Sequence, residues 1–242
     1  MIRIISIIVG VLLLGYFFIA GFYFRKDRNN RLCTEVEVVI KDSLEEYFVG
    51  ERELHEILRK KGIYPVKKKF ASINTEEIEK AVLSNEMVAN AEVYKTPSGI
   101  IKLEIEQKMP ILRVMGVKGN YYVDHRGKIM PISLRYVANV PIATGYVEKE
   151  FAKSDLYKFA LFLQENDFWN DLIVQIVVDE NYDVILIPRV GNCRILLGTL
   201  SDFEEKLDKL MLFYKQVVPK MGWDKYSMIN LKFKNQIVCT KK

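Results

Sequence analysis

The sequence predicts an α+β protein with one N-terminal membrane helix followed by two folded modules. Three observations lead to this prediction. An uncharged apolar run extends from Ile4 to Phe24, residues 33–108 show a strand–helix–helix–strand–strand pattern, and residues 109–242 show short alternating strands with two amphipathic helices. A chain of 242 residues has room for two small domains behind such a helix.

The apolar run has the length of a membrane span. At 1.5 Å per residue it forms a helix of about 30 Å, the thickness of the hydrocarbon core of a bilayer. The alternative is a cleaved signal peptide, which has a shorter apolar core and a small-x-small cleavage site. Neither feature is present before Arg25. We therefore expect an uncleaved transmembrane helix over 4–24, with residues 1–3 before it and a juxtamembrane linker over 25–32 after it.

The charges around this helix bear on its orientation. Residues 1–31 carry five basic and one acidic side chain, so they account for most of the net charge of +5. The basic residues after Phe24 would place the large domain in the cytoplasm if the positive-inside rule acted alone. This charge pattern conflicts with the orientation expected below. The remaining chain is nearly neutral, which argues against a nucleic-acid partner.

The first module, residues 33–108, begins with a strand over 34–41, where apolar and polar residues alternate. The sequence VGERELHEILRKKG predicts a helix that ends at Gly62, and Asn74 followed by Glu77 predicts the capped start of a second helix. Two more alternating stretches, at 89–94 and 101–106, predict a hairpin with a turn at 96–99.

The second module, residues 109–242, is richer in strands. Strands are predicted over 111–115, 120–124 and 128–132, with Asp124-His125-Arg126-Gly127 as the turn between the last two. Ser154 and the capping box of Ser201 with Glu204 predict the starts of two helices. Further strands are expected over 140–143, 172–178, 182–188, 193–197 and 228–239. The expected architecture is a mostly antiparallel sheet with two covering helices.

Chemistry-bearing residues are sparse. The sequence has no H-E-x-x-H, G-x-S-x-G, S-x-x-K or glycine-rich phosphate loop, and its two histidines lie in different modules. Three cysteines, Cys33, Cys193 and Cys239, form no C-x-x-C pair, and we favour free thiols over a Cys193–Cys239 bridge. We predict that the protein is not an enzyme, and expect no metal ion, no cofactor and no small-molecule substrate.

Several motifs resemble those of the FtsQ/DivIB family of bacterial division proteins. Tyr121 to Asp124, Gly127 and Pro131 match its Y-x-V-D-x-x-G-x-x-x-P element, and Pro141 to Gly145 match P-x-x-T-G. The stretches at 196–210 and 229–239 resemble the last helix and closing strand of that family. The resemblance covers nearly the whole chain. It implies that residues 33–108 are a POTRA domain and residues 109–242 an FtsQ-type β domain.

The resemblance also implies a function. The protein would be a scaffold of the divisome that links small coiled-coil proteins, FtsB and FtsL, to septal peptidoglycan synthesis. It would sit at the septum in the inner membrane, with its N-terminus cytoplasmic and its folded domains outside the cytoplasm. An alternative is a POTRA module of an envelope assembly or secretion system, although the helices of 109–242 do not suit that class.

The closing strand is the candidate docking site. Residues 228–239 end the fold, so we expect them to form a sheet edge that is either guarded by lysines or open to a partner strand. The resemblance places FtsB on this strand and the helix before it, with Phe233 a core residue in the alternative. The candidate partner-binding residues are Lys206, Tyr226, Met228, Asn230, Lys232 and Phe233. Asp124 and Gly127 are expected to form a structural turn, with a binding role as the alternative.

Overall fold

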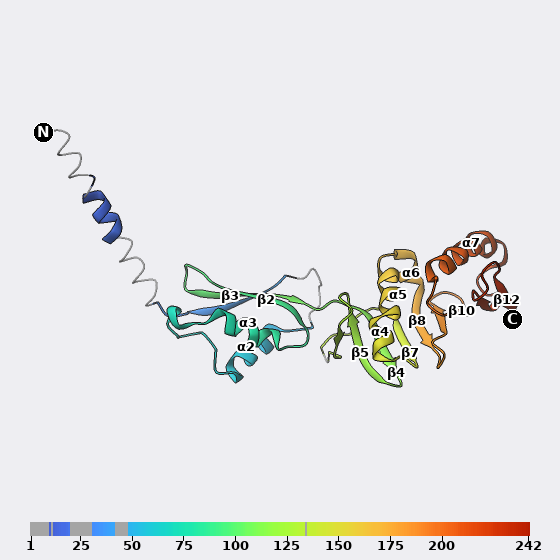
Figure 1. The fold of residues 1–242 in the computed structure, drawn as a ribbon, viewed down its shortest axis with the longest axis horizontal. Coiled ribbons are helices and arrows are strands. Elements are labelled where there is room, and N and C mark those ends of the chain that lie inside the picture. The colour runs from blue at the N-terminus through green and yellow to red at the C-terminus, as the bar shows by residue number, and fades with distance from the viewer. Residues whose placement is uncertain (1–9, 11, 20–30, 42–47, 134) are drawn as a thin grey trace. The chain divides into compact units, whose positions relative to one another are not determined.

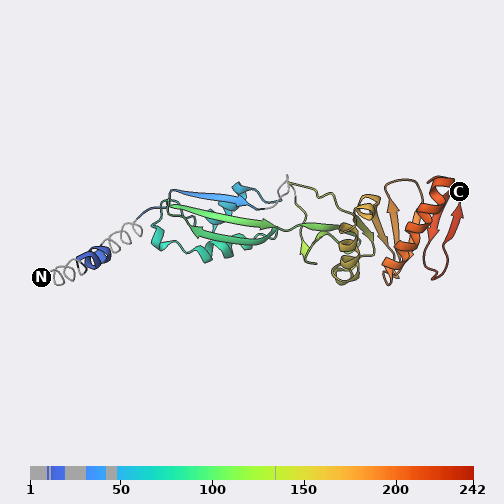
Figure 2. The ribbon, with the colours of Figure 1, turned by 90° about the horizontal axis from the view of Figure 1, so that it is seen from above.

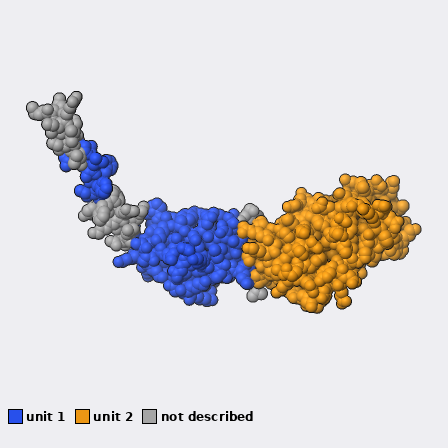
Figure 3. Space-filling model, in the orientation of Figure 1, with its two compact units in different colours: residues 1–107 blue, residues 108–242 orange. Residues whose placement is uncertain are grey.

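The computed structural model describes residues 10, 12–19, 31–41, 48–133 and 135–242. It divides into two compact units, Met1–Gln107 and Lys108–Lys242 (Figure 3). Residues 12–19 are helical, and most of the predicted anchor over 4–24 lies outside the described residues. Within the described stretches, no helix has the length and apolar character needed to cross a membrane.

Beyond residue 31, the first unit is a small sheet with two α-helices. The elements are β1 Glu35–Ile40, α2 Glu51–Lys60, the 3-10 helix η1 Phe70–Ser72, α3 Thr75–Leu83, β2 Val88–Lys95 and β3 Ile100–Gln107. The sheet order is β1-β3-β2, with β1 parallel and β2 antiparallel to β3. Both helices cover one face of the sheet (Figures 1 and 2). The predicted strand–helix–helix–strand–strand order is confirmed.

Local sequence explains these elements. Ile101, Leu103 and Ile105 alternate along β3 and are at most 1% exposed, so they form the face that the helices cover. The carboxamide oxygen of Asn74 accepts a hydrogen bond of 3.3 Å from the backbone N–H of Glu77, as a capped helix start requires. The alternation predicted for β2 is wrong at its start. A register shift between Val88 and Asn90 buries Val88 in place of Ala89.

The other face of this sheet carries a charged cluster around Glu104. Its carboxylate lies 2.8 Å from the ammonium of Lys41 and 3.5 Å from that of Lys102, and it accepts a hydrogen bond from the Tyr94 hydroxyl. The hydrogen bond from Lys41, followed by that from Tyr94, lowers the pKa of Glu104 to about 2. These bonds join β1, β2 and β3 across the sheet.

The second unit contains a nine-stranded sheet among its described residues. The strands are β4 Pro110–Gly116, β5 Gly119–Asp124, β6 Ile129–Met130, β7 Ile142–Gly145, β8 Ile173–Val178, β9 Val184–Pro188, β10 Arg194–Gly198, β11 Tyr226–Asn230 and β12 Val238–Lys241. The order is β12-β11-β10-β9-β8-β7-β4-β5-β6. Five of the neighbouring pairs are antiparallel, and three, β4–β7, β7–β8 and β10–β11, are parallel. The sheet is therefore mostly antiparallel, as expected, with three parallel pairs that the sequence did not predict.

Helices close the core of this unit. They are α4 Lys149–Lys153, α5 Asp155–Gln164, α6 Asp167–Leu172 and α7 Phe203–Met221. Sequence patterning predicted α5 and α7, whereas α4 and α6 are too short to show a period. The predicted capping box at Ser201 is wrong: Asp202 occupies the N-cap of α7 in a left-handed conformation (φ 55°), and the Ser201 hydroxyl pairs with that of Thr199 at 2.7 Å.

The hairpin motif forms the predicted turn. Gly127 has a φ of +71°, which a residue with a side chain adopts only with strain. Asp124 is 1% exposed, and one of its carboxylate oxygens accepts hydrogen bonds from the backbone N–H groups of Arg126 (2.9 Å) and Lys128 (2.7 Å). The tight turn therefore depends on both residues, which gives the motif a structural role.

Substitution of two glycines separates backbone strain from steric overlap. Gly127→Ala places a Cβ in ordinary contact with the Tyr157 ring at 3.6 Å, so only the left-handed backbone costs free energy, about 1–2 kcal/mol. Gly145→Ala places its Cβ 2.2 Å from the backbone oxygen of Val178, and we expect it to destabilise the unit far more. Both tryptophans, Trp169 and Trp223, lie in this unit, so urea unfolding followed by fluorescence reports on it selectively. Equal losses in the two variants would contradict this assignment.

The Glu104 cluster makes the first unit sensitive to acid. Because the folded-state pKa is depressed, the stabilisation is present above the unfolded carboxylate pKa of about 4.3 and is lost as the pH falls through about 2. Glu104→Gln should therefore destabilise the unit at pH 7 and have a smaller effect near pH 2. Hydrogen exchange of β3 amides at the two pH values measures this. A difference that does not depend on pH would contradict the prediction.

Candidate partner-binding surface

The end of the chain forms two strands rather than one. The single closing strand predicted over 228–239 is wrong, because β11 ends at Asn230 and the chain reverses before β12 begins at Val238. β11 lies between β10, its parallel neighbour, and β12, its antiparallel neighbour. Asn230 is therefore inside the sheet, and the free edge belongs to β12. A proline at Asn230 would disrupt an interior strand and cannot test an edge.

The pairing identifies the open backbone groups of β12. The backbone N–H of Lys242 donates to the carbonyl of Lys225 at 3.4 Å, so the backbone groups of Lys242 point toward β11. Backbone groups alternate in direction along an antiparallel strand, and the register shift in this pair lies on β11, between Tyr226 and Met228. The N–H and C=O groups of Cys239 and Lys241 consequently point away from β11, toward the edge that no described strand covers.

The side chains of β11 lie on two faces. Tyr226 packs on Phe213 of α7, with ring centroids 5.9 Å apart, and Ile229 is buried beneath the same helix. Met228 and Asn230 are half-buried and belong to the opposite face. Tyr226 is thus partly engaged within the unit, whereas Met228 and Asn230 remain accessible beside β12.

Two of the predicted binding lysines are engaged in contacts within the chain. The Lys206 ammonium donates to the carbonyls of Thr199 (2.7 Å) and Ser201 (2.8 Å), and its burial lowers its pKa. The Lys232 ammonium pairs with Asp183 at 2.5 Å. The methylene groups of Lys232 lie against Gly198, where an added Cβ would meet them at 2.8 Å. Both lysines therefore have contacts within the unit, and their binding to a partner stays a prediction.

Phe233 lies on the surface. Its side chain is 47% exposed, so the alternative that placed it in the core is wrong. The neighbouring residue Lys234 accepts a hydrogen bond of 2.8 Å through its carbonyl from the Lys209 ammonium on α7. This bond holds the turn that carries Phe233 close to the helix, so Phe233 is presented at the C-terminal surface.

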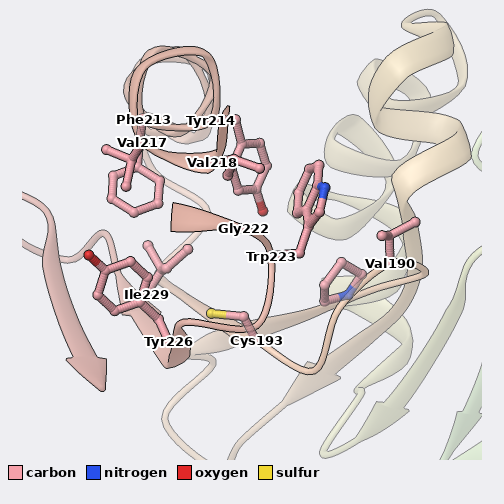
Figure 4. Close-up of a pocket in the computed structure, with 11 residues that line it drawn as sticks. Val190, Cys193, Phe213, Tyr214, Val217, Val218, Gly222, Trp223, Tyr226 and Ile229 are labelled. Atoms are coloured by element: carbon pink, nitrogen blue, oxygen red, sulfur yellow. The ribbon is translucent and has the colours of Figure 1, made fainter. Parts of the chain in front are cut away.

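A small apolar cavity lies between α7 and the sheet (Figure 4). Phe213, Tyr214 and Val218 enter it from the helix, and Tyr226 and Ile229 enter it from β11. Cys193 lines the same cavity, and burial raises the pKa of its thiol to about 11. This sulfur is a poor nucleophile in such surroundings. The cavity marks the contact between α7 and the final strands.

An open groove of about 630 Å³ lies beside α7, between this helix, Phe168 of α6 and Trp223. Sequence reasoning did not identify it. Phe168, on α6, is 41% exposed, and Trp223, just after α7, is 37% exposed. The groove is lined by Phe168, Met211, Tyr214, Lys215, Val218, Pro219 and Trp223. The signal in the sequence is that α7 carries apolar residues beyond its fully buried positions, among them Met211 and Val218, which are half-buried.

All three cysteines are free thiols in this structure. Cys193 directly precedes β10, Cys239 lies on β12, and β11 separates the two strands. Two strand spacings amount to about 9.5 Å, whereas the Cα atoms of a disulfide lie roughly 4.4–6.8 Å apart. A Cys193–Cys239 bridge would require β11 to leave the sheet. Among the described residues, no group of three or more His, Cys, Asp or Glu is placed to hold a metal ion.

The fold and this surface define a two-module α+β protein whose C-terminal module presents an open sheet edge and an apolar groove, features of proteins that bind other proteins. A model for POTRA-like domains matches residues 31–106, and the model described as FtsQ/DivIB, C-terminal related, matches residues 109–240. Since the second match covers more than half of the chain, the chain belongs to the FtsQ/DivIB family. The resemblance predicted from the sequence is confirmed.

A curated relative supports this assignment. A cell division protein FtsQ from Rhodothermus marinus is 29% identical over 166 residues, which are 62% of this chain. The match spans 59% of the length of that relative.

The role of Lys206 can be tested directly. Lys206→Met removes the donor that bridges two carbonyls before α7, and we expect a loss of about 1 kcal/mol in the free energy of unfolding. Tryptophan fluorescence in urea measures this loss. Lys220→Met, an exposed position on the same helix, serves as the control and should have little effect. If Lys206→Met were as stable as the unmodified protein, the bridging role would be refuted.

Proposed function

We propose that this protein is a non-catalytic scaffold of bacterial cell division, anchored in the inner membrane. Its partners are small coiled-coil division proteins of the FtsB and FtsL type, which link it to septal peptidoglycan synthesis. The open edge of β12 carries the proposal. Family membership and the division protein from Rhodothermus marinus support the process, and the edge supports the mode of binding.

We interpret the edge of β12 as open to a partner strand rather than protected from one. Native edges are protected by short strand length, charged side chains, bulges, prolines or covering segments. With four residues, β12 is itself a short strand. β12 carries no proline, the register shift lies on β11, and no described strand covers β12. Its lysines are Lys241, the last residue of the strand, and Lys242, which follows the strand. The Lys242 ammonium is paired with the carboxylate of Asp224 at 3.3 Å. Val238 and Phe233, 42% and 47% exposed, offer apolar side chains on and just before β12.

The apolar run Ile4–Phe24 supports a single membrane span. Family membership, and not the charge pattern, is the reason for placing the two units outside the cytoplasm at the septum, because the basic residues after Phe24 favour the opposite orientation. In this arrangement the POTRA-like unit stands nearest the membrane and contributes recruitment contacts, and the β domain contributes the main partner surface. Labelling of an introduced surface cysteine with a membrane-impermeant thiol reagent tests the orientation. Labelling that occurs only after the inner membrane is lysed would refute it.

A proline at Lys241 tests strand addition. The N–H of Lys241 points outward, so Lys241→Pro removes a donor that a partner strand needs without removing a bond to β11. We expect the variant to keep its fluorescence-monitored unfolding midpoint and to lose capture of the FtsB-type protein of the same bacterium in a pull-down. Lys241→Gln, which keeps the N–H and loses the charge, should bind normally.

The two variants together distinguish strand addition from binding through the charge of the lysine. If Lys241→Pro still captures the partner while folded, β12 is not the docking edge. If Lys241→Gln loses capture as well, the lysine charge is responsible and strand addition is wrong.

A further inference from the structure

A dense run of basic residues on the first unit has no role in the proposed partner surface. The sequence RKKGIYPVKKK, residues 59–69, contains six basic residues and no acidic one. All six are exposed. We call them the basic collar: Arg59, Lys60, Lys61, Lys67, Lys68 and Lys69.

The collar is fixed to the place where the chain enters the first unit. The N–H of Lys67 donates to the carbonyl of Cys33 at 2.8 Å, and the N–H of Cys33 donates to the carbonyl of Lys68 at 2.9 Å. The N–H of Phe70 donates to the carbonyl of Arg31 at 2.9 Å, and Leu32 pairs with Lys69 as an antiparallel bridge. In Figure 1 the segment between α2 and α3 returns to the end of the sheet where β1 begins. Lys67, Lys68 and Lys69 therefore flank residues 31–33.

The charge of the collar is not neutralised within the described residues. None of its six side chains forms an ion pair there, whereas Lys41, Lys80 and Lys102 of the same unit all do. The Lys68 ammonium donates only to the carbonyl of Gly62, at 3.0 Å. Glu76, at the start of α3, is already paired with Lys80 at 2.6 Å. The collar thus presents positive charge to its surroundings.

An apolar side chain accompanies this charge. Leu32 is 52% exposed although it lies beside Lys69. The guanidinium of Arg59 stacks over the ring of Tyr64 at 4.7 Å, which places an aromatic side chain within the collar as well. Basic groups with interspersed apolar and aromatic side chains are typical of surfaces that contact lipid headgroups.

Chain length restricts what the collar can meet. Six residues lie between Phe24, the end of the apolar run, and Arg31, so the chain takes seven residue steps from one to the other. A fully extended chain spans at most about 3.6 Å per residue, so Arg31 lies within roughly 25 Å of the end of that run. A membrane that holds the run is thus always within reach of the collar. No other macromolecule is held near it by the chain itself.

We propose that the basic collar docks on anionic phospholipid headgroups of the membrane in which Ile4–Phe24 is anchored. The inference rests on the membrane anchoring given under the proposed function. Docking would fix the orientation of the first unit against the bilayer surface, so that the unit does not rotate freely on its linker. The recognised chemistry is the phosphate of a lipid headgroup at high surface density.

Hydrogen exchange of the full chain in lipid nanodiscs tests the proposal. Discs are made of phosphatidylcholine alone or with phosphatidylglycerol added, and peptides covering 59–70 are followed by mass spectrometry. Exchange should slow in the anionic discs by roughly the factor of five that one docked lysine contributes, or more. High salt should remove this protection because it screens the attraction. Free inorganic phosphate should not reproduce it.

A triple variant locates the effect. Lys67→Gln, Lys68→Gln and Lys69→Gln together should abolish the difference between the two kinds of disc. Lys149→Gln, Lys220→Gln and Lys225→Gln remove the same charge from exposed positions of the second unit and should leave the difference unchanged. If the first variant fails to fold, the salt dependence of the unmodified protein still decides the question.

The outcomes separate this inference from the proposed function. A chain that co-purifies with neither kind of disc would refute the membrane anchor. A chain that inserts into both but exchanges equally at 59–70 would refute the collar, and so would protection that the control triple variant also loses.

Discussion

The packing of α7 against β10 and β11 is the contact on which the C-terminal surface depends. β10 and β11 are parallel, and parallel neighbours need a crossover connection, which α7 supplies. Leu207, Leu210 and Tyr214 bury the helix against the sheet, and Ile229 meets them from β11. Without this apolar contact, only the pairing of three residues of β10 with three residues of β11 would hold the final strands to the sheet. The edge of β12 and the groove beside α7 therefore both depend on the packing of α7 against β10 and β11.

Periodicity predicted most of the fold. The buried alternation of β3 and the capped start of α3 both follow from residues close in sequence, so local patterns were sufficient. The failures have local causes too. A bulge shifts the face of β2 at Val88, and Asp202 takes the N-cap that Ser201 was predicted to occupy. A bulge changes burial without changing composition, and two polar residues in a row leave the choice of cap to the tertiary fold.

The candidate surface was less predictable because its contacts are distant in sequence. Alternation continued from Ile229 to Phe233, so the reversal that makes β12 the edge could not be seen. Lys206 and Lys232 were predicted to bind a partner because they lie in the right segment. Within the chain, the ammonium group of Lys206 contacts the carbonyls of residues 199 and 201, and that of Lys232 contacts the carboxylate of residue 183. Their binding to a partner stays a prediction. The groove combines Phe168 with residues of α7 more than forty positions later, a combination that no single window contains.

The short edge sets a limit on affinity in solution. β12 has four residues, and only Cys239 and Lys241 direct backbone groups outward. Each backbone hydrogen bond contributes about 1 kcal/mol net, so strand addition here gives weak binding unless side chains such as Phe233 and Val238 add apolar contacts. The proposed membrane anchor would change this balance, because two partners held in one bilayer meet at high effective concentration. A basic collar docked on the same bilayer would restrict the first unit further. The proposed anchor and the weak edge would then be complementary: the anchor would bring the partners close together, and the edge would select the partner in a complex that stays reversible.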